Sequence, residues 1–235
     1  SLRLGIKTVT HLKMIKIKNF MNHIVTELLD QPQAYLLIQQ AEAILNEEQK
    51  KRADFYSTMN EEKVEFINGE IISNSPAMKR HCDATKLLAG LLDFYVRKHN
   101  LGFVGVEKIM ISLTRNDYEP DICFFGQKKA KDFKDDQLLF PASDFVVEVL
   151  SKKTEKKDRG IKFEDYQAHG VEEYWIIDPK KQVVEQYHLV SQQYKLIAKL
   201  TKGAIKSFVI SGFEIPVKAI FDEKLNMEVL GDLIR

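Results

Sequence analysis

Apolar residues recur at helical spacing in three parts of the chain. Residues 22–59 carry two apolar stripes with that spacing, separated by Pro32, and residues 79–99 carry one continuous stripe. A third helical pattern runs from Asp158 to His169, and Gly170 follows it as a residue suited to a left-handed cap. We therefore expect helices over these three ranges, with the first one broken at Pro32.

Strand-like runs lie between and after the helices. In KVEFINGEIISNSP, Asn68 and Gly69 both tolerate positive φ and predict a two-residue hairpin turn. The runs FVGVEKIMISL, DICFFG, DFVVEVLS and EYWIIDP each read as one core strand, and VVEQYHLV with YKLIAKL reads as a hairpin. The central order of helix, three strands, helix and strand predicts an α+β fold with a mixed central β-sheet flanked by helices.

Two acidic residues interrupt the apolar strand runs. Glu148 lies inside FVVEVL, and Asp121 opens DICFFG directly after Pro120. Because a buried carboxylate is costly without compensation, both need an explanation. If the two strands are neighbours, the carboxylates can converge and bind Mg²⁺ or Mn²⁺, which prefer oxygen ligands. A buried ion pair, or an acid at a sheet edge in contact with water, explains the pattern equally well.

The helix that follows adds a candidate cation. Asp158, Lys162 and Tyr166 are spaced i, i+4, i+8 and share one helical face. A lysine beside two carboxylates and a metal can hold a water or stabilise negative charge on a phosphorane-like transition state. The alternative is an ordinary solvated face with an Asp–Lys pair, whose contribution to stability is small.

Composition limits the class of protein. The chain has 235 residues, and its 44% hydrophobic content is enough for one sizeable globular domain. We expect a partly helical N-terminal extension over residues 1–50, with Met21 as an alternative start, and one domain over residues 51–235. The net charge of +1 excludes a global basic signal for nucleic acid, so DNA binding would need a local patch.

Other classes of function find no support in the sequence. There is no apolar run of membrane-spanning length, no phosphate-binding glycine loop, no zinc-ligand spacing and no nucleophile-elbow serine motif. Cys82 and Cys123 are too few for a disulfide framework, and Cys123 lies in a core-like run. We expect a reducing, cytoplasmic setting and no association with membranes.

The motifs PDICFF, VVEVLSKKT and DRGIKFEDYQAHGVEEYWIIDP, with VEFINGEIISNSPAMKRH upstream, resemble the Uma-type restriction endonuclease family. This family belongs to the PD-(D/E)xK nuclease superfamily, and the resemblance covers roughly residues 55–190. It implies a restriction-endonuclease-like core and a metal-dependent nuclease activity. It also implies that Asp121 and Glu148 bind the metal, Mg²⁺ or alternatively Mn²⁺.

The sequence departs from the superfamily pattern at one position. Leu150 stands two residues after Glu148, where that pattern has lysine. In this family the lysine comes from the following helix, so the resemblance identifies Lys162 as the third catalytic residue. Lys152 and Lys153 are nearer in sequence, but we expect them in a loop beyond the strand.

Other residues are weaker candidates for the site. Glu70 matches a family position after the hairpin turn, His81 opens the long helix, and Asp158 is placed to orient Lys162. Glu107 could also point toward the site from the first core strand. For Glu70 a solvent-facing strand position is an equal alternative, and for His81 a cap or surface position is favoured. We expect Trp175 in the core rather than stacked on a base.

Two functions remain open at this point. The first is an Mg²⁺-dependent endonuclease that hydrolyses DNA phosphodiester bonds, with phosphate contacts from local lysines. The second is a catalytically inactive nuclease fold that acts as a binding or assembly module, which the near-neutral charge and the absence of lysine at position 150 favour. A metal-dependent hydrolase of small phosphoesters is a weaker third reading. A homodimer is compatible with cleavage of both DNA strands, although nothing in the sequence requires one.

Overall fold

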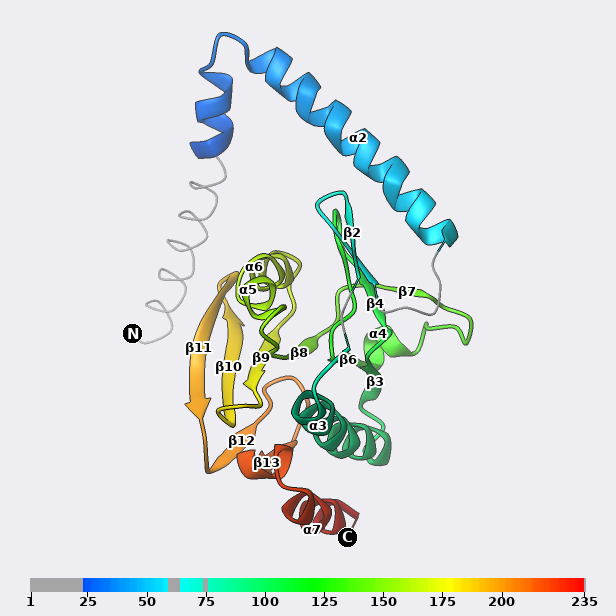
Figure 1. Ribbon diagram of the computed structural model, residues 1–235, viewed down its shortest axis with the longest axis vertical. Helices are drawn as coiled ribbons and strands as arrows, with labels where there is room; N and C mark the ends of the chain where they lie inside the picture. Colours follow the sequence, from blue (N-terminus) through cyan, green and yellow to red (C-terminus); the bar gives the residue numbers. More distant parts are fainter. Residues whose placement is uncertain (1–22, 59–63, 74–75, 235) are drawn as a thin grey trace, which may run out of the picture. The chain divides into compact units, whose positions relative to one another are not determined.

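The computed structural model describes residues 23–58, 64–73 and 76–234, and the chain divides into two compact units, residues 1–60 and 61–235 (Figure 1). In the first unit a short helix over residues 23–29 is separated by a turn from α2, Ala34–Thr58. The helical character of this segment and its break near Pro32 are therefore confirmed. The domain boundary expected at residue 50 stays a prediction. None of the described helices is both long and apolar enough to cross a bilayer.

The second unit is built on a mixed six-stranded sheet in the order β11-β10-β9-β8-β6-β3. Only the β8–β9 pair is parallel among the described strands of this sheet, and its other pairs are antiparallel. The parallel pair requires a crossover, which α5 and α6 supply. The strands are β3 Gly102–Val106, β6 Ile122–Gly126, β8 Phe145–Val149, β9 Glu173–Asp178, β10 Val183–Val190 and β11 Gln193–Leu200.

A second sheet has the order β2-β1-β5-β4-β7. The predicted hairpin turn joins β1 to β2, with φ of 51° at Asn68 and 81° at Gly69. The strands of this sheet are β1 Val64–Ile67, β2 Glu70–Ser73, β4 Met110–Ser112, β5 Asp117–Tyr118 and β7 Leu139–Phe140.

The expectation of a single strand across FVGVEKIMISL is wrong. The chain leaves the six-stranded sheet at the end of β3 and enters the second sheet as β4. Glu107 makes the turn with a φ of 60°, and its N–H donates to the Asp121 carbonyl at 3.0 Å. The apolar alternation continues across the break because both sheets bury one side of this segment, so the pattern hides the change of sheet.

Helices and a small C-terminal hairpin complete the second unit. Contacts join α3 to β3, β8, η1 and α7, which places these helices together in Figure 1. The elements are α3 Lys79–Lys98, α4 Gln127–Ala130, α5 Glu155–Asp158, α6 Ile161–Ala168, β12 Ala204–Lys206, β13 Glu214–Pro216, the 3₁₀ helix η1 Val217–Ile220 and α7 Glu223–Ile234.

Strand β8 is buried on both faces of the six-stranded sheet. Phe145, Val147 and Val149 pack in one core with residues of α3 and the C-terminal segment, while Val146 packs in another with residues of α6 and the second sheet. Full burial of each such side chain stabilises the fold by about 1.5–3 kcal/mol. The alternation predicted from the sequence is thus confirmed, and Glu148 shares the face of Val146.

Glu173, at the start of β9, ties the C-terminal segment to this sheet. Its side chain is fully buried, and Oε1 accepts hydrogen bonds from Trp175 Nε1 and Gln186 Nε2, both at 2.7 Å. Oε2 accepts from Ser207 Oγ at 2.6 Å and from the backbone N–H groups of residues 208 and 209 at 2.9 and 3.2 Å. A carboxylate with five donors is stable in the interior, since each donor replaces a bond to water.

Replacing Glu173 with alanine is expected to lower the free energy of unfolding by at least about 3 kcal/mol, because several buried donors lose their acceptor. Urea denaturation followed by circular dichroism measures this loss. The matched control is Glu172→Ala, since the Glu172 side chain is 57% exposed and its contact with His188 is at the surface. The control should stay within about 0.5 kcal/mol of the wild type. Equal stabilities for the two variants would contradict the anchoring role of Glu173.

Candidate active site

A buried ammonium group lies among three carboxylates. The Nζ atom of Lys162 is 2.7 Å from Glu65 Oε1, 2.9 Å from Glu148 Oε1 and 3.6 Å from Asp158 Oδ1. All four side chains are at most 4% exposed. Charged groups this deeply buried are tolerated only when they are paired, so the four residues form one electrostatic unit.

The members of this unit come from separate elements. Glu148 is carried by the central strand β8, Glu65 by β1 of the second sheet, Asp158 by the end of α5 and Lys162 by the first turn of α6. The site therefore lies where the two sheets and the β8–β9 crossover meet. The continuous helix expected from Asp158 to His169 is instead divided at Gly160, between α5 and α6.

Gly160 makes that division possible. It has φ −115° and ψ −105°, and a Cβ atom at this position would lie 2.8 Å from the carbonyl oxygen of Lys156. A side chain here would force the two helices apart. The break keeps Asp158 and Lys162 on the same side, so the spacing predicted from the sequence still brings both head groups to Glu148.

Asp121 lies beside this unit and is held by the neighbouring strands. It directly precedes β6, and its Oδ2 atom accepts a hydrogen bond from the backbone N–H of Val149 at 2.8 Å. The same oxygen is 3.2 Å from Nε2 of His81, on the first turn of α3. Since Val149 follows Glu148, this bond fixes the Asp121 carboxylate next to the strand position that carries Glu148.

Tyrosine side chains form the apolar wall of the site. The Tyr166 hydroxyl donates to Glu148 Oε1 at 3.1 Å, and the Lys162 ammonium lies 5.7 Å from the centre of the Tyr118 ring. Tyr118 and Tyr166 pack edge to face, and the Tyr174 hydroxyl donates to the Asp158 carbonyl at 3.0 Å. These rings exclude water and strengthen the electrostatic interactions that they surround.

The pKa values of the acids and the lysine reflect this environment. Burial raises the pKa of Glu148 well above its usual range, and Lys162 only partly opposes this effect. Burial raises the pKa of Asp158 for the same reason. For Lys162 burial acts to lower the pKa, but Glu148 and Glu65 outweigh it and raise the pKa well above that of a free lysine. The ammonium is therefore charged, whereas burial favours the neutral, protonated forms of Glu148 and Asp158.

A divalent cation would stabilise the ionised forms of these buried acids. The buried carboxylates of Glu65, Asp121, Glu148 and Asp158 supply oxygen ligands of the kind that Mg²⁺ and Mn²⁺ prefer. Neither carboxylate oxygen of Asp158 makes a hydrogen bond among the described residues, although both are buried. Across residues 23–58, 64–73 and 76–234, no three acidic, histidine or cysteine groups form a ready-made metal cage. The donor chemistry thus fits a metal, and Lys162 lies among the ligands.

The structure brings most of the predicted site residues together. Glu148, Lys162 and Asp158 are in direct contact, and Asp121 pairs with His81 beside them. Glu70 is exposed on β2, opposite Ile67, and takes part in none of these contacts. The roles assigned to all of these residues stay predictions.

The residues next to the unit lie in the core, in a loop and in a turn. Leu150 is buried in the same core as Val146, whereas Lys152 and Lys153 are exposed beyond the end of β8, in the loop where they were expected. Glu107 is partly buried and its backbone contacts Asp121. Trp175 is fully buried in the core, as predicted.

Glu65 is the site residue that the sequence reasoning missed. It forms the shortest of the three contacts with Lys162, and its Oε1 atom also accepts the backbone N–H of Glu119 at 3.2 Å. The signal was present in the sequence, because Glu65 interrupts the apolar run Val64–Ile67 as Glu148 interrupts its own strand. Glu70, the acid predicted from the resemblance, lies on the other strand of the same hairpin.

Comparisons with known proteins agree with this architecture. A protein from Synechocystis sp. (strain ATCC 27184 / PCC 6803 / Kazusa), named "Uncharacterized protein sll1609", is 29% identical over 142 residues, which cover 59% of this chain and 79% of the relative. A crystal structure from Anabaena variabilis ATCC 29413, described as a "putative nuclease belonging to DUF820", superposes with a TM-score of 0.61 at 18% identity. That match covers 72% of this chain and 96% of the other, and at this identity it shows a shared fold.

The sequence model of the Uma2 family, described as "Putative restriction endonuclease", matches residues 52–218. That range is well over half of the chain and contains Glu65, Glu148, Asp158 and Lys162, which together form the lysine–carboxylate unit. It also contains Asp121 and His81. This chain belongs to the Uma2 family.

Proposed function

We propose that this protein is a metal-dependent endonuclease that hydrolyses DNA phosphodiester bonds. The observation that carries the proposal is the buried contact of Lys162 with Glu148, next to Asp121 on the neighbouring strand. Two acids from adjacent strands and one lysine are the groups that metal-assisted phosphodiester hydrolysis uses. The family description and the name of the Anabaena structure point in the same direction.

Asp121 and Glu148 are the residues proposed to hold Mg²⁺, with Mn²⁺ as an alternative. When bound, such an ion lowers the pKa of a coordinated water and offsets negative charge on the scissile phosphate. The backbone N–H of Val149 on β8 would hold Asp121 in place, and the hydroxyl of Tyr166 on α6 would hold Glu148.

Lys162 and His81 are proposed to assist these two acids. Lys162 stays protonated at neutral pH because Glu148 and Glu65 raise its pKa, so it serves as a hydrogen-bond donor and positive charge rather than as a base. It can orient the attacking water or stabilise the pentavalent phosphorus species. His81 is placed to orient Asp121 through the 3.2 Å contact.

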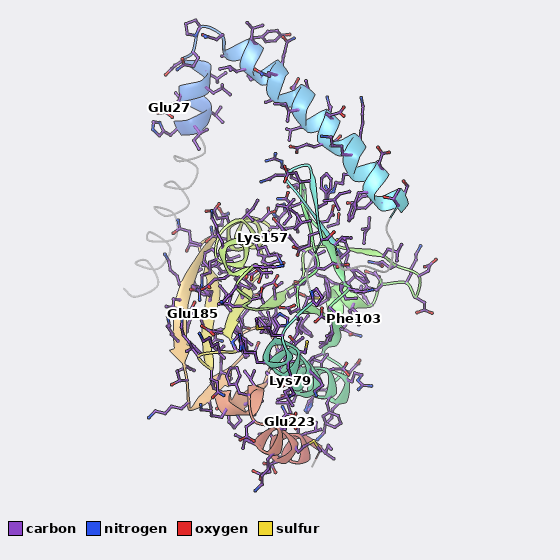
Figure 2. All side chains as sticks on the ribbon, in the orientation of Figure 1. Glu27, Lys79, Phe103, Lys157, Glu185 and Glu223 are labelled. Carbon is purple, nitrogen blue, oxygen red and sulfur yellow. The ribbon has the colours of Figure 1, made fainter. Side chains whose placement is uncertain are left out.

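DNA would be held by basic residues close to the site. Lys152, Lys153, Lys156 and Lys157 occur within six residues of Asp158, and three of them are exposed. Lys79 and Arg80 open α3 beside His81, although Lys79 is paired with Asp83. Lys157 and Lys79 are labelled in Figure 2. These residues give the local positive charge that a near-neutral protein needs to bind phosphates.

A catalytically inactive binding or assembly module is the second candidate. It is favoured by the engagement of the Lys162 ammonium with Glu65 and Glu148, and by the leucine at position 150. A homodimer and a cytoplasmic location stay predictions under either function.

Cleavage of supercoiled plasmid by the purified protein separates the two candidates. With Mg²⁺ or Mn²⁺ we expect wild-type cleavage, and Glu148→Ala should reduce the rate by at least about 10²-fold because a metal ligand and the partner of Lys162 are lost. Glu164→Gln is the control, since Glu164 is an exposed acid on the same helix as Lys162. If the wild type cuts no DNA with either metal, the module is the better description.

Glu65→Gln tests the residue that joins Lys162 to the second sheet. The substitution keeps the size of the side chain and removes the anion closest to the ammonium. We expect the cleavage rate to fall between about ten- and a hundredfold, because a displaced catalytic group loses its alignment. The dissociation constant for DNA, measured by fluorescence anisotropy, should not change. Cleavage at the wild-type rate would show that Glu65 does not position Lys162.

The lysines of α5 and its preceding loop should carry phosphate contacts. The triple substitution of Lys152, Lys156 and Lys157 with glutamine should weaken DNA binding and reduce the slope of log K against log salt by about 0.9 for each lost contact. The same change at Lys195, Lys202 and Lys206, which are exposed on β11, β12 and the turn between them, is the control. If the two triple variants gave equal salt slopes, the lysines of α5 and its preceding loop would not contact DNA phosphates.

A further inference from the structure

Asp158 is the least satisfied member of the lysine–carboxylate unit. Its side chain is 1% exposed, and neither carboxylate oxygen has a partner in good hydrogen-bond geometry among the described residues. Burial raises its pKa, and Lys162 and the Thr154 side chain only partly oppose this effect. Its closest positive charge is Lys162 Nζ at 3.6 Å, whereas the same ammonium lies 2.7 Å from Glu65 and 2.9 Å from Glu148. An acid buried in this way is costly unless another state of the site gives it a partner.

The binding of a cation at Glu148 would create such a state. Lys162 and a metal ion bound to the same carboxylate repel each other. This repulsion favours a shift of the ammonium toward its remaining partners. Asp158 is within reach, because a displacement of under about 1 Å would bring Lys162 to the distance of a charged hydrogen bond.

We propose that Asp158 receives the ammonium of Lys162 when a divalent cation binds to Asp121 and Glu148. Asp158 then acts as a positioning residue that sets metal affinity through Lys162, without binding the metal itself. Glu65 remains in contact with Lys162 in both states and limits its movement. The proposal rests on the metal site of the proposed function.

The geometry around Asp158 favours this role over a purely structural one. The Tyr174 hydroxyl holds the Asp158 backbone carbonyl at 3.0 Å, so the position of the residue does not depend on its carboxylate. The residue lies at the last position of the four-residue helix α5, which is too short for a helix dipole to account for the burial of its carboxylate. The carboxylate is therefore not needed to hold the Asp158 backbone in place, and Lys162 is the cation beside it.

A double-mutant cycle on metal binding tests the proposal. Mn²⁺ is titrated into the full chain, and the free ion is followed by electron paramagnetic resonance in the absence of DNA. Asp158→Asn should weaken binding about tenfold, because Lys162 loses its alternative partner, and Lys162→Met should tighten it about tenfold. Combined with Lys162→Met, Asp158→Asn should change the affinity less than about twofold, since no ammonium remains to be relocated.

The cycle separates this role from the two obvious alternatives. If Asp158 were a metal ligand or acted only through its charge, its substitution would weaken Mn²⁺ binding equally with and without Lys162, and that result overturns the proposal. Wild-type affinity in Asp158→Asn overturns it as well, whatever the lysine variants do. If the wild-type protein binds no Mn²⁺, both this proposal and the metal site are overturned. If the wild type binds Mn²⁺ and Asp158→Asn binds it equally well, this proposal alone is overturned.

Two controls keep the result interpretable. Circular dichroism and thermal unfolding establish that each variant is folded. If Lys162→Met does not fold, Lys162→Gln replaces it, because the amide can still donate to Glu65 and Glu148 without carrying a charge. Glu164→Gln removes an exposed acid from the same helix and should leave the Mn²⁺ affinity within about twofold of the wild type.

Discussion

The organisation of the second unit depends on one buried ion cluster, Lys162 with Glu65, Glu148 and Asp158. Each of these residues comes from a different element, so the cluster forms only when β1, β8, α5 and α6 are all in place. Breaking a buried pair leaves an uncompensated charge and costs about 3–5 kcal/mol, which makes this assembly highly specific. The cluster therefore links the two sheets to the crossover between β8 and β9.

The apolar packing around this cluster offsets the free-energy cost of burying its charged groups. Glu148 interrupts a strand that is otherwise buried on both faces, and burial raises its pKa even with a lysine in contact. Replacing such a cluster with apolar residues is often neutral or stabilising, so stability alone does not explain its presence. Strongly shifted pKa values at one buried site are typical of functional sites, and this supports a role in chemistry.

Much of this arrangement can be predicted from the sequence. The alternation around Glu148, the spacing of Asp158, Lys162 and Tyr166, and the Asn68–Gly69 turn are local patterns with direct physical meaning, and the structure has all three. The sequence leaves open whether the strands that follow Asp121 and carry Glu148 are neighbours, and the structure pairs them as β6 and β8.

The rest depends on contacts between distant segments. Glu65 reaches Lys162 only because β1 pairs with β5 in a second sheet, and the continuous apolar pattern across Glu107 conceals where that sheet begins. The partner of Asp121 is likewise hidden, since His81 is 40 positions away on α3. Local periodicity contains no information on such pairings, although an acid within an apolar run marks the residues that require one.

The position of Lys162 on a helix rather than on a strand has a structural consequence. A lysine at position 150 would be fixed by the pleat of β8, on the same face as Glu148. Here Leu150 packs in the core instead, and the ammonium group of Lys162 comes from α6. This helix is held by hydrogen bonds that Asp165 accepts from Asn116 at 2.7 Å and from Tyr118 at 2.9 Å. The Gly160 break lets α6 lie at its own angle to α5. Because the long side chain of Lys162 starts from a helix rather than from the strand that carries Glu148, it can exchange one carboxylate for another without disturbing the sheet.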